Sequence, residues 1–335
     1  MSGSSGIPGL ETCFLEPEGW RWHSFERKGR HIRFGSVFPK DSIPDAVVVC
    51  LPGLSEFCEK YFEVARTLLD KNLAFWVIDW VGQGRSSRYL KNPHKRHSDG
   101  FQEDIDDLHE WIMGYIHHSS VHPDVGRIPL ALLAHSMGGH LGLRYMQQHP
   151  DTFECAAFTA PMFGLKVFEN VPSPLSLALT GFLGAAAGQT YVAGGADWQE
   201  EMRPNPGHDS FSGDAMRGAV HNAWCLADPE LQVGRITYGW LYQAAASCRA
   251  LQKLSSFDAI QAHCLVASAG VEDFVDNSAI QKITDRLPHV KHLDFPHARH
   301  EILMETDDIR TAFFDAFYQM IQETIIDRPE TLKPF

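Results

Sequence analysis

Positive charge, regularly spaced cysteines and a nucleotide-binding glycine pattern are all scarce or absent in this sequence. The 29 lysines and arginines are outnumbered by 42 aspartates and glutamates, and the net charge of −13 argues against a nucleic-acid partner. The 7 cysteines are scattered and odd in number, which indicates thiols in a reducing compartment rather than a disulfide framework. No Cys and His spacing typical of zinc and no G-x-G-x-x-G pattern occurs, so we expect neither a metal nor another cofactor.

The N-terminal residues also lack the features of a secretory signal, because Met1–Gly6 has no basic start and no apolar stretch follows it directly. We expect residues 1–18 to form a flexible leader. From Gly19 to Phe38 the sequence alternates around Lys28 and Gly29, which predicts an opening β-hairpin. The 335 residues, 44% of them apolar, are enough for one large core.

The most informative stretch is residues 129–140, where a short apolar strand is expected to enter a tight turn that opens an amphipathic helix. Ser136 at the tip of such a turn has a strained backbone, which is tolerated only when the residues two before and two after it are small. Ala134 and Gly138 meet that requirement. The pattern predicts a nucleophilic serine, with the N–H of Met137 directed at a developing oxyanion.

A nucleophilic serine needs a base, and the base needs a carboxylate that orients it. A buried strand is expected at residues 262–268, and we predict that Asp273 in the loop after it is the orienting residue. Glu272 and Asp276 are competing carboxylates in the same loop. Asp276 fits a helix cap, since it precedes a helix-like segment.

The base is expected in the loop that follows another short strand at residues 290–295. We predict that it is His300, which lies just before an amphipathic C-terminal helix, and His297 is its competitor. A second oxyanion donor is expected after the apolar strand at residues 46–50. There Gly53 lets the backbone approach a ligand, so we assign this role to the Leu54 N–H, with a plain Pro-Gly turn as the alternative.

The chain order of Ser136, Asp273 and His300 is that of the α/β-hydrolases. On this order and its motifs the chain resembles the bacterial lysophospholipase and monoacylglycerol lipase branch of that superfamily, which includes serine aminopeptidase-type hydrolases. The motifs are Pro52-Gly-x-x-Glu56, Asp79-x-x-Gly82-x-Gly84-x-Ser86, His135-Ser136-Met137-Gly138-Gly139, Ala160-Pro161-Met162, Thr237-Tyr-Gly-Trp240, Ala269-Gly-x-x-Asp273 and Ala298-Arg-His300-Glu301.

The resemblance implies an α/β-hydrolase fold, with a mostly parallel central sheet, helices on both faces and an inserted helical lid over an acyl-chain pocket. We expect the core at residues 19–161 and 257–328 and the lid at residues 162–256. The sequence departs from the family pattern at Pro52, where histidine is usual, and at Ala134, where glycine is usual. Because proline has no N–H and stiffens the chain, the hydrogen bonds that hold the oxyanion loop are expected to differ.

The expected lid has an uncharged stretch from Val171 to Ala196, in which leucines cluster among glycine and alanine. Glycine dilutes this stretch too far for a transmembrane helix, which needs about 20 strongly apolar residues. Two interpretations remain: the lid lines the pocket with its apolar face, or its outer face also contacts a membrane. Trp240 and Tyr242 are candidates for lining the site, and the basic residues around Lys91 are interpreted as a solvated loop.

We predict a serine hydrolase that cleaves the carboxylic ester of a monoacyl lipid, either a lysophospholipid or a monoacylglycerol, through an acyl-enzyme on Ser136. The predicted partners are a small lipid ester and, through the lid, a membrane surface, and the predicted location is the cytoplasm or the periphery of the inner membrane. An amide- or peptide-cleaving hydrolase and a non-catalytic scaffold of the same fold are the alternatives. Nothing in the sequence predicts the oligomeric state.

Overall fold

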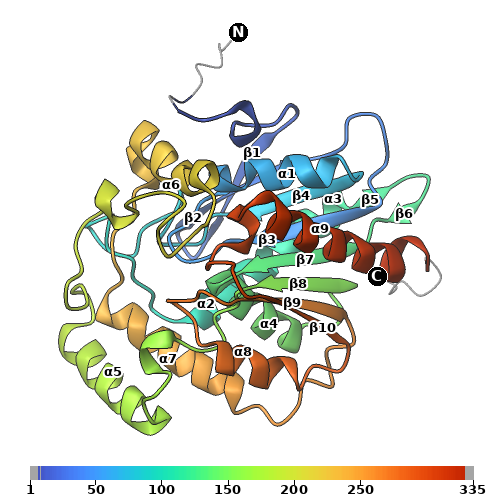
Figure 1. Cartoon of the computed structure of the whole chain (residues 1–335). Helices are drawn as coiled ribbons and strands as arrows, with labels where there is room; N and C mark the ends of the chain where they lie inside the picture. The colour runs from blue at the N-terminus through green and yellow to red at the C-terminus, as the bar shows by residue number, and fades with distance from the viewer. Residues whose placement is uncertain (1–6, 8, 329–335) are drawn as a thin grey trace.

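An eight-stranded sheet forms the centre of the protein in a computed structural model that describes residues 7 and 9–328 (Figure 1). The strand order is β1-β2-β4-β3-β7-β8-β9-β10, and β5 and β6 form a separate two-stranded sheet. The strands are β1 (Arg21–Arg27), β2 (Arg30–Val37), β3 (Ala46–Leu51), β4 (Leu73–Ile78), β5 (Val121–His122), β6 (Gly126–Arg127), β7 (Leu130–His135), β8 (Cys155–Thr159), β9 (His263–Ala269) and β10 (Val290–Phe295).

Most neighbouring strands of the large sheet are parallel, as predicted. Only β1–β2 and β2–β4 are antiparallel. The β1–β2 hairpin turns at Lys28 and Gly29, whose φ angles of 52° and 73° match the left-handed turn that two-residue hairpins favour. The predicted opening hairpin is therefore confirmed.

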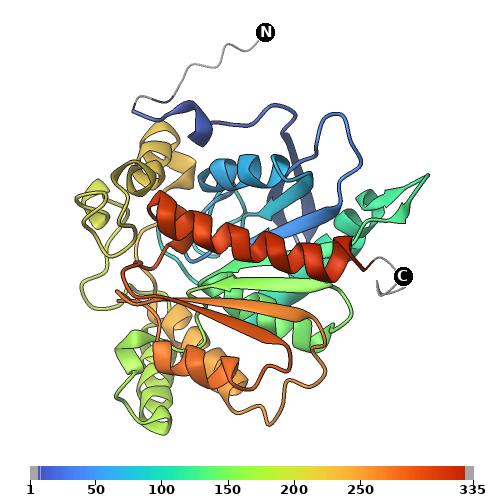
Figure 2. The same cartoon turned by 45° about the vertical axis from the view of Figure 1, so that its right-hand side comes forward.

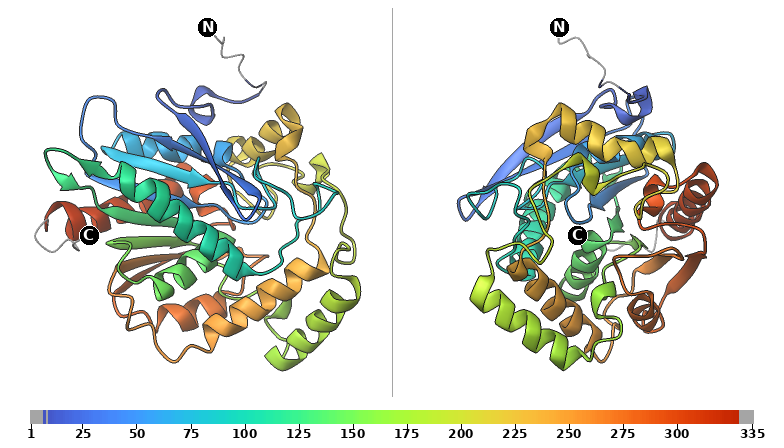
Figure 3. Two further views of the ribbon diagram at one scale, coloured as in Figure 1. Left: turned by 180° about the vertical axis from the view of Figure 1, so that it is seen from behind. Right: turned by 60° about the vertical axis from the view of Figure 1, so that its left-hand side comes forward.

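Helices cover both faces of the sheet. α1 and α9 lie on one face of the sheet (Figure 2). α2 and α4 lie on the opposite face, which the left view of Figure 3 shows. Every residue of β3 and β7 is buried, as expected for apolar strands covered on both sides. The α-helices are α1 (Phe62–Leu69), α2 (Phe101–Trp111), α3 (His117–Ser119), α4 (Met137–Gln148), α5 (Ser173–Ala187), α6 (Ala215–Ala227), α7 (Tyr238–Gln252), α8 (Asn277–Thr284) and α9 (Asp307–Ile321).

The expected lid corresponds to a helical insertion between β8 and β9. It has two parts: α5 packs against α7, and α6 lies apart from this pair, toward α1 (Figure 1). Leu175, Leu179 and Phe182 of α5 are 59%, 52% and 70% exposed, so an apolar face of this helix is turned to solvent. Within the described residues, no helix combines the length and the apolar content needed to cross a bilayer.

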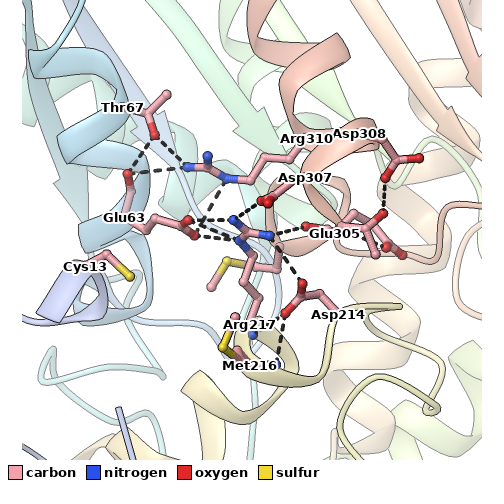
Figure 4. A network of polar contacts seen from close by, with 12 residues as sticks. Cys13, Glu63, Thr67, Asp214, Met216, Arg217, Glu305, Asp307, Asp308 and Arg310 are labelled. Atoms are coloured by element: carbon pink, nitrogen blue, oxygen red, sulfur yellow. Dashed lines mark hydrogen bonds and ion pairs between the residues drawn. The ribbon is translucent and has the colours of Figure 1, made fainter. Parts of the chain in front are cut away.

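An ionic network attaches α6 to the core (Figure 4). The Arg217 guanidinium of α6 lies 2.9 Å from Glu63 Oε1 of α1 and 2.7 Å from Asp307 Oδ1 of α9, and it donates to the Glu305 carbonyl at 2.9 Å. Arg217 and Glu63 are each only 9% exposed. Because Glu305 follows the loop of His300, this lid side chain contacts α1 and the chain between that loop and α9.

The N-terminal segment is more ordered than expected. Phe14, in a short 3₁₀ turn, is 3% exposed and packs against Val220 of α6 and Met304. The expectation of a flexible leader over residues 1–18 is therefore wrong around Phe14, whose apolar ring has a partner on the lid. Residues 1–6 lie outside the described residues.

Candidate active site

Ser136 occupies the sharp turn between β7 and α4. Its φ of 50° is in the left-handed region, where a residue other than glycine is strained. The turn fits only because Gly138 has no side chain: a Cβ added there would lie 2.1 Å from the carbonyl oxygen of Leu51. The turn is fixed by hydrogen bonds from Ser136 N to Thr159 O (3.0 Å) and from Met162 N to Ser136 O (2.9 Å). The predicted strand–turn–helix geometry around Ser136 is confirmed.

His300 lies within hydrogen-bond distance of Ser136. The distance from His300 Nε2 to Ser136 Oγ is 2.9 Å, and the other ring nitrogen, Nδ1, lies 2.7 Å from Glu272 Oε2. All three side chains are buried, whereas the competitor His297 is exposed. The structure thus brings together a hydroxyl, an imidazole and a carboxylate in one chain of contacts.

The carboxylate in this chain is Glu272 and not Asp273, which corrects the sequence prediction. Asp273 is exposed, and its carboxylate accepts a hydrogen bond from Ser210 at 2.5 Å. The loop leaves β9 through Gly270, where an added Cβ would lie 2.3 Å from the Pro296 carbonyl oxygen. This close approach sets the direction of the loop, so that the Glu272 side chain points at His300 and the Asp273 side chain points away from it.

Glu272 is held in its ionised form. Burial alone would raise its pKa, but the nearby His300 and the backbone N–H groups of Phe274 and Val275 lower the pKa below its usual value. These two N–H groups donate to Glu272 Oε1 at 2.7 and 3.2 Å, which leaves Oε2 for His300. The remaining competitor, Asp276, caps α8 by accepting from Ser278 N at 2.8 Å, as predicted.

The two amides assigned to an oxyanion hole lie next to Ser136. Met137 is the first residue of α4, and Leu54 lines the cavity that contains Ser136 and His300. Neither N–H donates a hydrogen bond to another residue of the described chain. Both N–H groups are therefore free of partners within the described chain, and that of Met137 lies at the positive end of a helix dipole.

The loop that carries Leu54 is held without the histidine that is usual at position 52. The Trp80 indole N–H donates to the Pro52 carbonyl at 2.9 Å, and the Gln83 amide donates to the Gly53 carbonyl at 2.7 Å. The Gly53 N–H in turn donates to Glu56 Oε2 at 2.5 Å. The hydrogen bonds around Pro52 therefore differ from the family pattern, as expected, and side chains that follow β3 and β4 supply them.

A buried ionic network continues from this loop to the histidine loop. Lys60 Nζ lies 2.7 Å from Glu56 Oε1 and 2.6 Å from Glu301 Oε1, and Arg203 Nη2 of the lid lies 2.8 Å from the same Glu301 oxygen. All four side chains are at most 7% exposed. Burial would raise the pKa of Glu301, but Arg203 and Lys60 hold it well below the usual value. No sequence motif joins these residues, because they come from three distant segments.

Ser136 and His300 open onto a cavity of about 320 Å³ between the core and the lid, near the lower end of the usual range for small-molecule sites. Its wall is largely apolar, and Trp240 contributes to it as predicted. Tyr242 instead packs against Gly184 of α5. Apolar residues of the expected lid, among them Trp198, Ile236 and Leu241, line the cavity, but no residue of α5 does, and the apolar face of this helix lies outside.

Comparisons with known proteins agree with this geometry. The family model for serine aminopeptidase, S33, matches residues 42–307. The chain is 30% identical over 280 residues to lysophospholipase L2 of Escherichia coli strain K12, which covers 81% of this chain and 79% of that protein. It is 30% identical over 165 residues to a monoacylglycerol lipase of Mycolicibacterium smegmatis, which covers 49% of this chain and 54% of that protein.

The fold is shared with solved structures of much lower identity. A carboxyl esterase from Bacillus coagulans superposes with a TM-score of 0.69 at 17% identity, covering 92% of this chain and 100% of the other. The names of these relatives agree with the expectation of a carboxylic ester hydrolase. With a family model that matches most of its length and an α/β-hydrolase sheet around a serine turn, the chain belongs to the serine aminopeptidase S33 family of α/β-hydrolases.

Proposed function

We propose that the protein is a serine hydrolase that cleaves the carboxylic ester of a monoacyl lipid through an acyl-enzyme on Ser136. The observation that carries this proposal is the chain of contacts from Ser136 Oγ through His300 to Glu272, which opens onto a largely apolar cavity. A hydroxyl and an imidazole at this distance, with a carboxylate on the second ring nitrogen, form the arrangement that activates serine as a nucleophile.

In the proposed mechanism, His300 Nε2 takes the Ser136 proton as Oγ attacks the ester carbonyl. Glu272 accepts a hydrogen bond from the Nδ1–H group of His300 and stabilises the imidazolium that forms. The N–H groups of Leu54 and Met137 stabilise the negative oxygen of the tetrahedral intermediate. His300 then protonates the leaving alcohol, and a water molecule activated by the same imidazole hydrolyses the acyl-enzyme.

The shape and chemistry of the cavity support a substrate with one acyl chain. Apolar side chains, among them Leu165, Val167, Ile236 and Val275, line much of the wall near Ser136, and such surfaces bind a hydrocarbon chain by the hydrophobic effect. The volume of about 320 Å³ suits one chain better than two. The relatives named as lysophospholipase and monoacylglycerol lipase support the same substrate class.

Contact with a membrane surface is the second part of the proposal. Leu175, Leu179 and Phe182 follow one another at helical spacing on α5 and are all exposed, so they form an apolar strip on the outer side of the lid. Such a strip would let the protein approach the inner membrane from the cytoplasm and take its substrate there.

A fluorophosphonate probe tests the proposal. We expect mass spectrometry to find one adduct, on Ser136, with labelling abolished in Ser136→Ala and slowed at least about a hundredfold in His300→Ala. Ser55→Ala is the matched control, because Ser55 lines the same cavity but lies outside the contact chain, and its labelling should be unchanged.

Hydrolysis assays then separate the classes of substrate. A lysophospholipid, a monoacylglycerol and a fatty amide of equal chain length are compared, and we expect both esters to be cleaved much faster than the amide. Absence of an adduct on folded protein would favour a non-catalytic scaffold of the same fold. Faster cleavage of the amide would favour the aminopeptidase-like alternative.

A further inference from the structure

One part of the cavity wall carries charged and polar groups that the proposed ester cleavage does not use. Arg203, His221 and Glu301 line the cavity there, next to Ser55 and Glu56 of the oxyanion loop. Burial and the nearby Arg203 lower the pKa of His221 well below its usual value, so this imidazole is neutral and carries no charge into the cavity. The charges in this part of the lining therefore belong to Arg203 and the two glutamates, and buried Asp209 also acts on Arg203.

The Arg203 guanidinium does not use all of its hydrogen-bond donors within the described chain. Its Nη2 pairs with Glu301 Oε1 at 2.8 Å, and its guanidinium stacks on the Phe211 ring, with Cζ 3.7 Å from the ring centroid. Its Nη1, although buried, has no hydrogen-bond partner in the described chain. The side chain is only 7% exposed, and a buried N–H without an acceptor is unfavourable, so an oxygen of a ligand would recover the lost hydrogen bond.

Glu56 has donors of its own, whereas Glu301 Oε2 is, like Arg203 Nη1, buried without a hydrogen-bond partner among the described residues. Glu56 accepts from Lys60, the Tyr61 hydroxyl and the Gly53 N–H, and Lys60 also contacts Glu301. Lys60 thus offsets the negative charge beside Arg203. A guanidinium presents two parallel N–H edges, and it binds the oxygens of carboxylate and phosphate groups especially well.

A second guanidinium, that of Arg235, lines the same cavity from the segment before α7. Its side chain is exposed, and no carboxylate of the described residues lies within ion-pair distance of it. The remaining carboxylate of the lining, Asp273, is exposed and bonded to Ser210, where water screens its charge. The cavity therefore offers two guanidinium groups to an anionic group, beside carboxylates that contact Lys60 or are screened by water.

We propose that Arg203 binds the phosphate of the substrate's head group, with Arg235 adding positive charge at the same cavity, and that the protein thereby prefers lysophospholipids to monoacylglycerols. This inference rests on the proposed function. In a lysophospholipid the phosphate is attached to the glycerol that leaves, so it lies only a few bonds from the scissile ester. A monoacylglycerol has a neutral hydroxyl at that place. Because Phe211 covers one face of the guanidinium, binding includes a small displacement of this half-buried ring.

The test compares two substrates in each variant, below their critical micelle concentrations. The value of kcat/KM is measured for a lysophosphatidylcholine and a monoacylglycerol of equal chain length in the parent protein, Arg203→Gln, Arg203→Lys and Arg235→Gln. Lys91→Gln is the matched control, since it removes an exposed positive charge outside the cavity lining. The ratio of the two values does not depend on the fraction of enzyme that is folded.

We expect Arg203→Gln to lower the ratio of lysophospholipid to monoacylglycerol cleavage by about 10- to 100-fold, the loss typical of a charge-assisted hydrogen bond. Arg203→Lys should recover part of it, because the charge remains and the planar fork is lost. Arg235→Gln should lower the ratio by a smaller factor, and Lys91→Gln should leave it unchanged. An unchanged ratio in both Arg203 variants would show that Arg203 only supports the fold.

Inorganic phosphate and glycerol 3-phosphate distinguish the source of the phosphate. We expect glycerol 3-phosphate to inhibit the parent protein competitively and Arg203→Gln much less, with inorganic phosphate the weaker inhibitor. Stronger inhibition by inorganic phosphate would point to a site for the free ion and overturn the head-group proposal. Cleavage of p-nitrophenyl butyrate, which has no head group, tests ester hydrolysis alone, so failure of the two proposals can be told apart.

Discussion

At the scale of single residues, Glu272 and Asp273 are neighbours in the chain with opposite surroundings. Glu272 is 7% exposed and accepts two backbone hydrogen bonds in addition to its contact with His300. Asp273 is exposed at the edge of the cavity. A carboxylate that orients an imidazole needs to be fixed and shielded from water, and only Glu272 meets both conditions.

Glu272→Gln is therefore expected to lower kcat by about a thousandfold or more, because the amide cannot stabilise the imidazolium and favours the wrong tautomer of His300. Asp273→Asn, which makes the same chemical change one residue later, should lower kcat by less than about threefold. Steady-state hydrolysis of a short-chain ester measures both. If the Asp273 variant loses the larger part of the activity, the loop has a different conformation in solution.

The sequence predicted those features that depend on local pattern. The elbow at Ser136, the β1–β2 hairpin and the cap at Asp276 each follow from a few adjacent residues, and each is found where it was expected. The choice between Glu272 and Asp273 depends instead on how Gly270 packs against a loop from another segment. The Lys60–Glu301–Arg203 network joins three segments far apart in the chain, so no window of sequence contains its signal.

At the scale of elements, α5 is the part of the lid whose role was least determined by its sequence. It has no charged residue, and its apolar side chains lie on all sides of the helix, so the pattern alone could not say which side faces the protein. In the structure α7 covers one side, with Gly184 against Tyr242, and Leu175, Leu179 and Phe182 remain exposed. An exposed apolar strip of this kind is costly in water unless it has a partner.

Replacing Leu175, Leu179 and Phe182 together by serine is expected to reduce cosedimentation with phosphatidylglycerol–phosphatidylethanolamine vesicles by at least about tenfold, because each side chain loses roughly 1.5–3 kcal/mol of burial in the membrane. Cleavage of a water-soluble ester should not change, since α5 does not line the cavity. Replacing Val121 and Val125, which are 51% and 59% exposed around the β5–β6 hairpin, is the matched control. Equal vesicle binding by parent and α5 variant would refute membrane contact through this helix.

At the scale of the whole molecule, the fold buries three histidines so deeply that the effect of burial on their pKa outweighs that of the carboxylates near two of them. Burial lowers the pKa of His135 to about 4 and that of His140 to about 3, from an ordinary value of 6.5, and His221 shifts in the same direction. His140 accepts or donates one hydrogen bond with Ser247 between α4 and α7, at 2.6 Å. These imidazoles are therefore neutral in the folded protein, and conditions that favour their protonation lower the free energy of unfolding.

Stability is accordingly expected to fall when the pH drops below about 6.5. Below this pH the unfolded chain binds protons on these histidines and the folded protein does not, so protons favour unfolding. Between pH 6.5 and 5.5 each fully shifted histidine should lower the free energy of unfolding by about 1 kcal/mol, and protonation of Asp104, whose pKa burial raises to about 7, offsets part of the total. Urea unfolding at pH 7.5, 6.5 and 5.5 measures this. In His140→Gln, which keeps a polar side chain for Ser247, the decrease between pH 6.5 and 5.5 should be smaller by about 1 kcal/mol. An identical pH dependence in parent and variant would mean that His140 is protonated in the folded protein, and that its surroundings are more open to water than the structure shows.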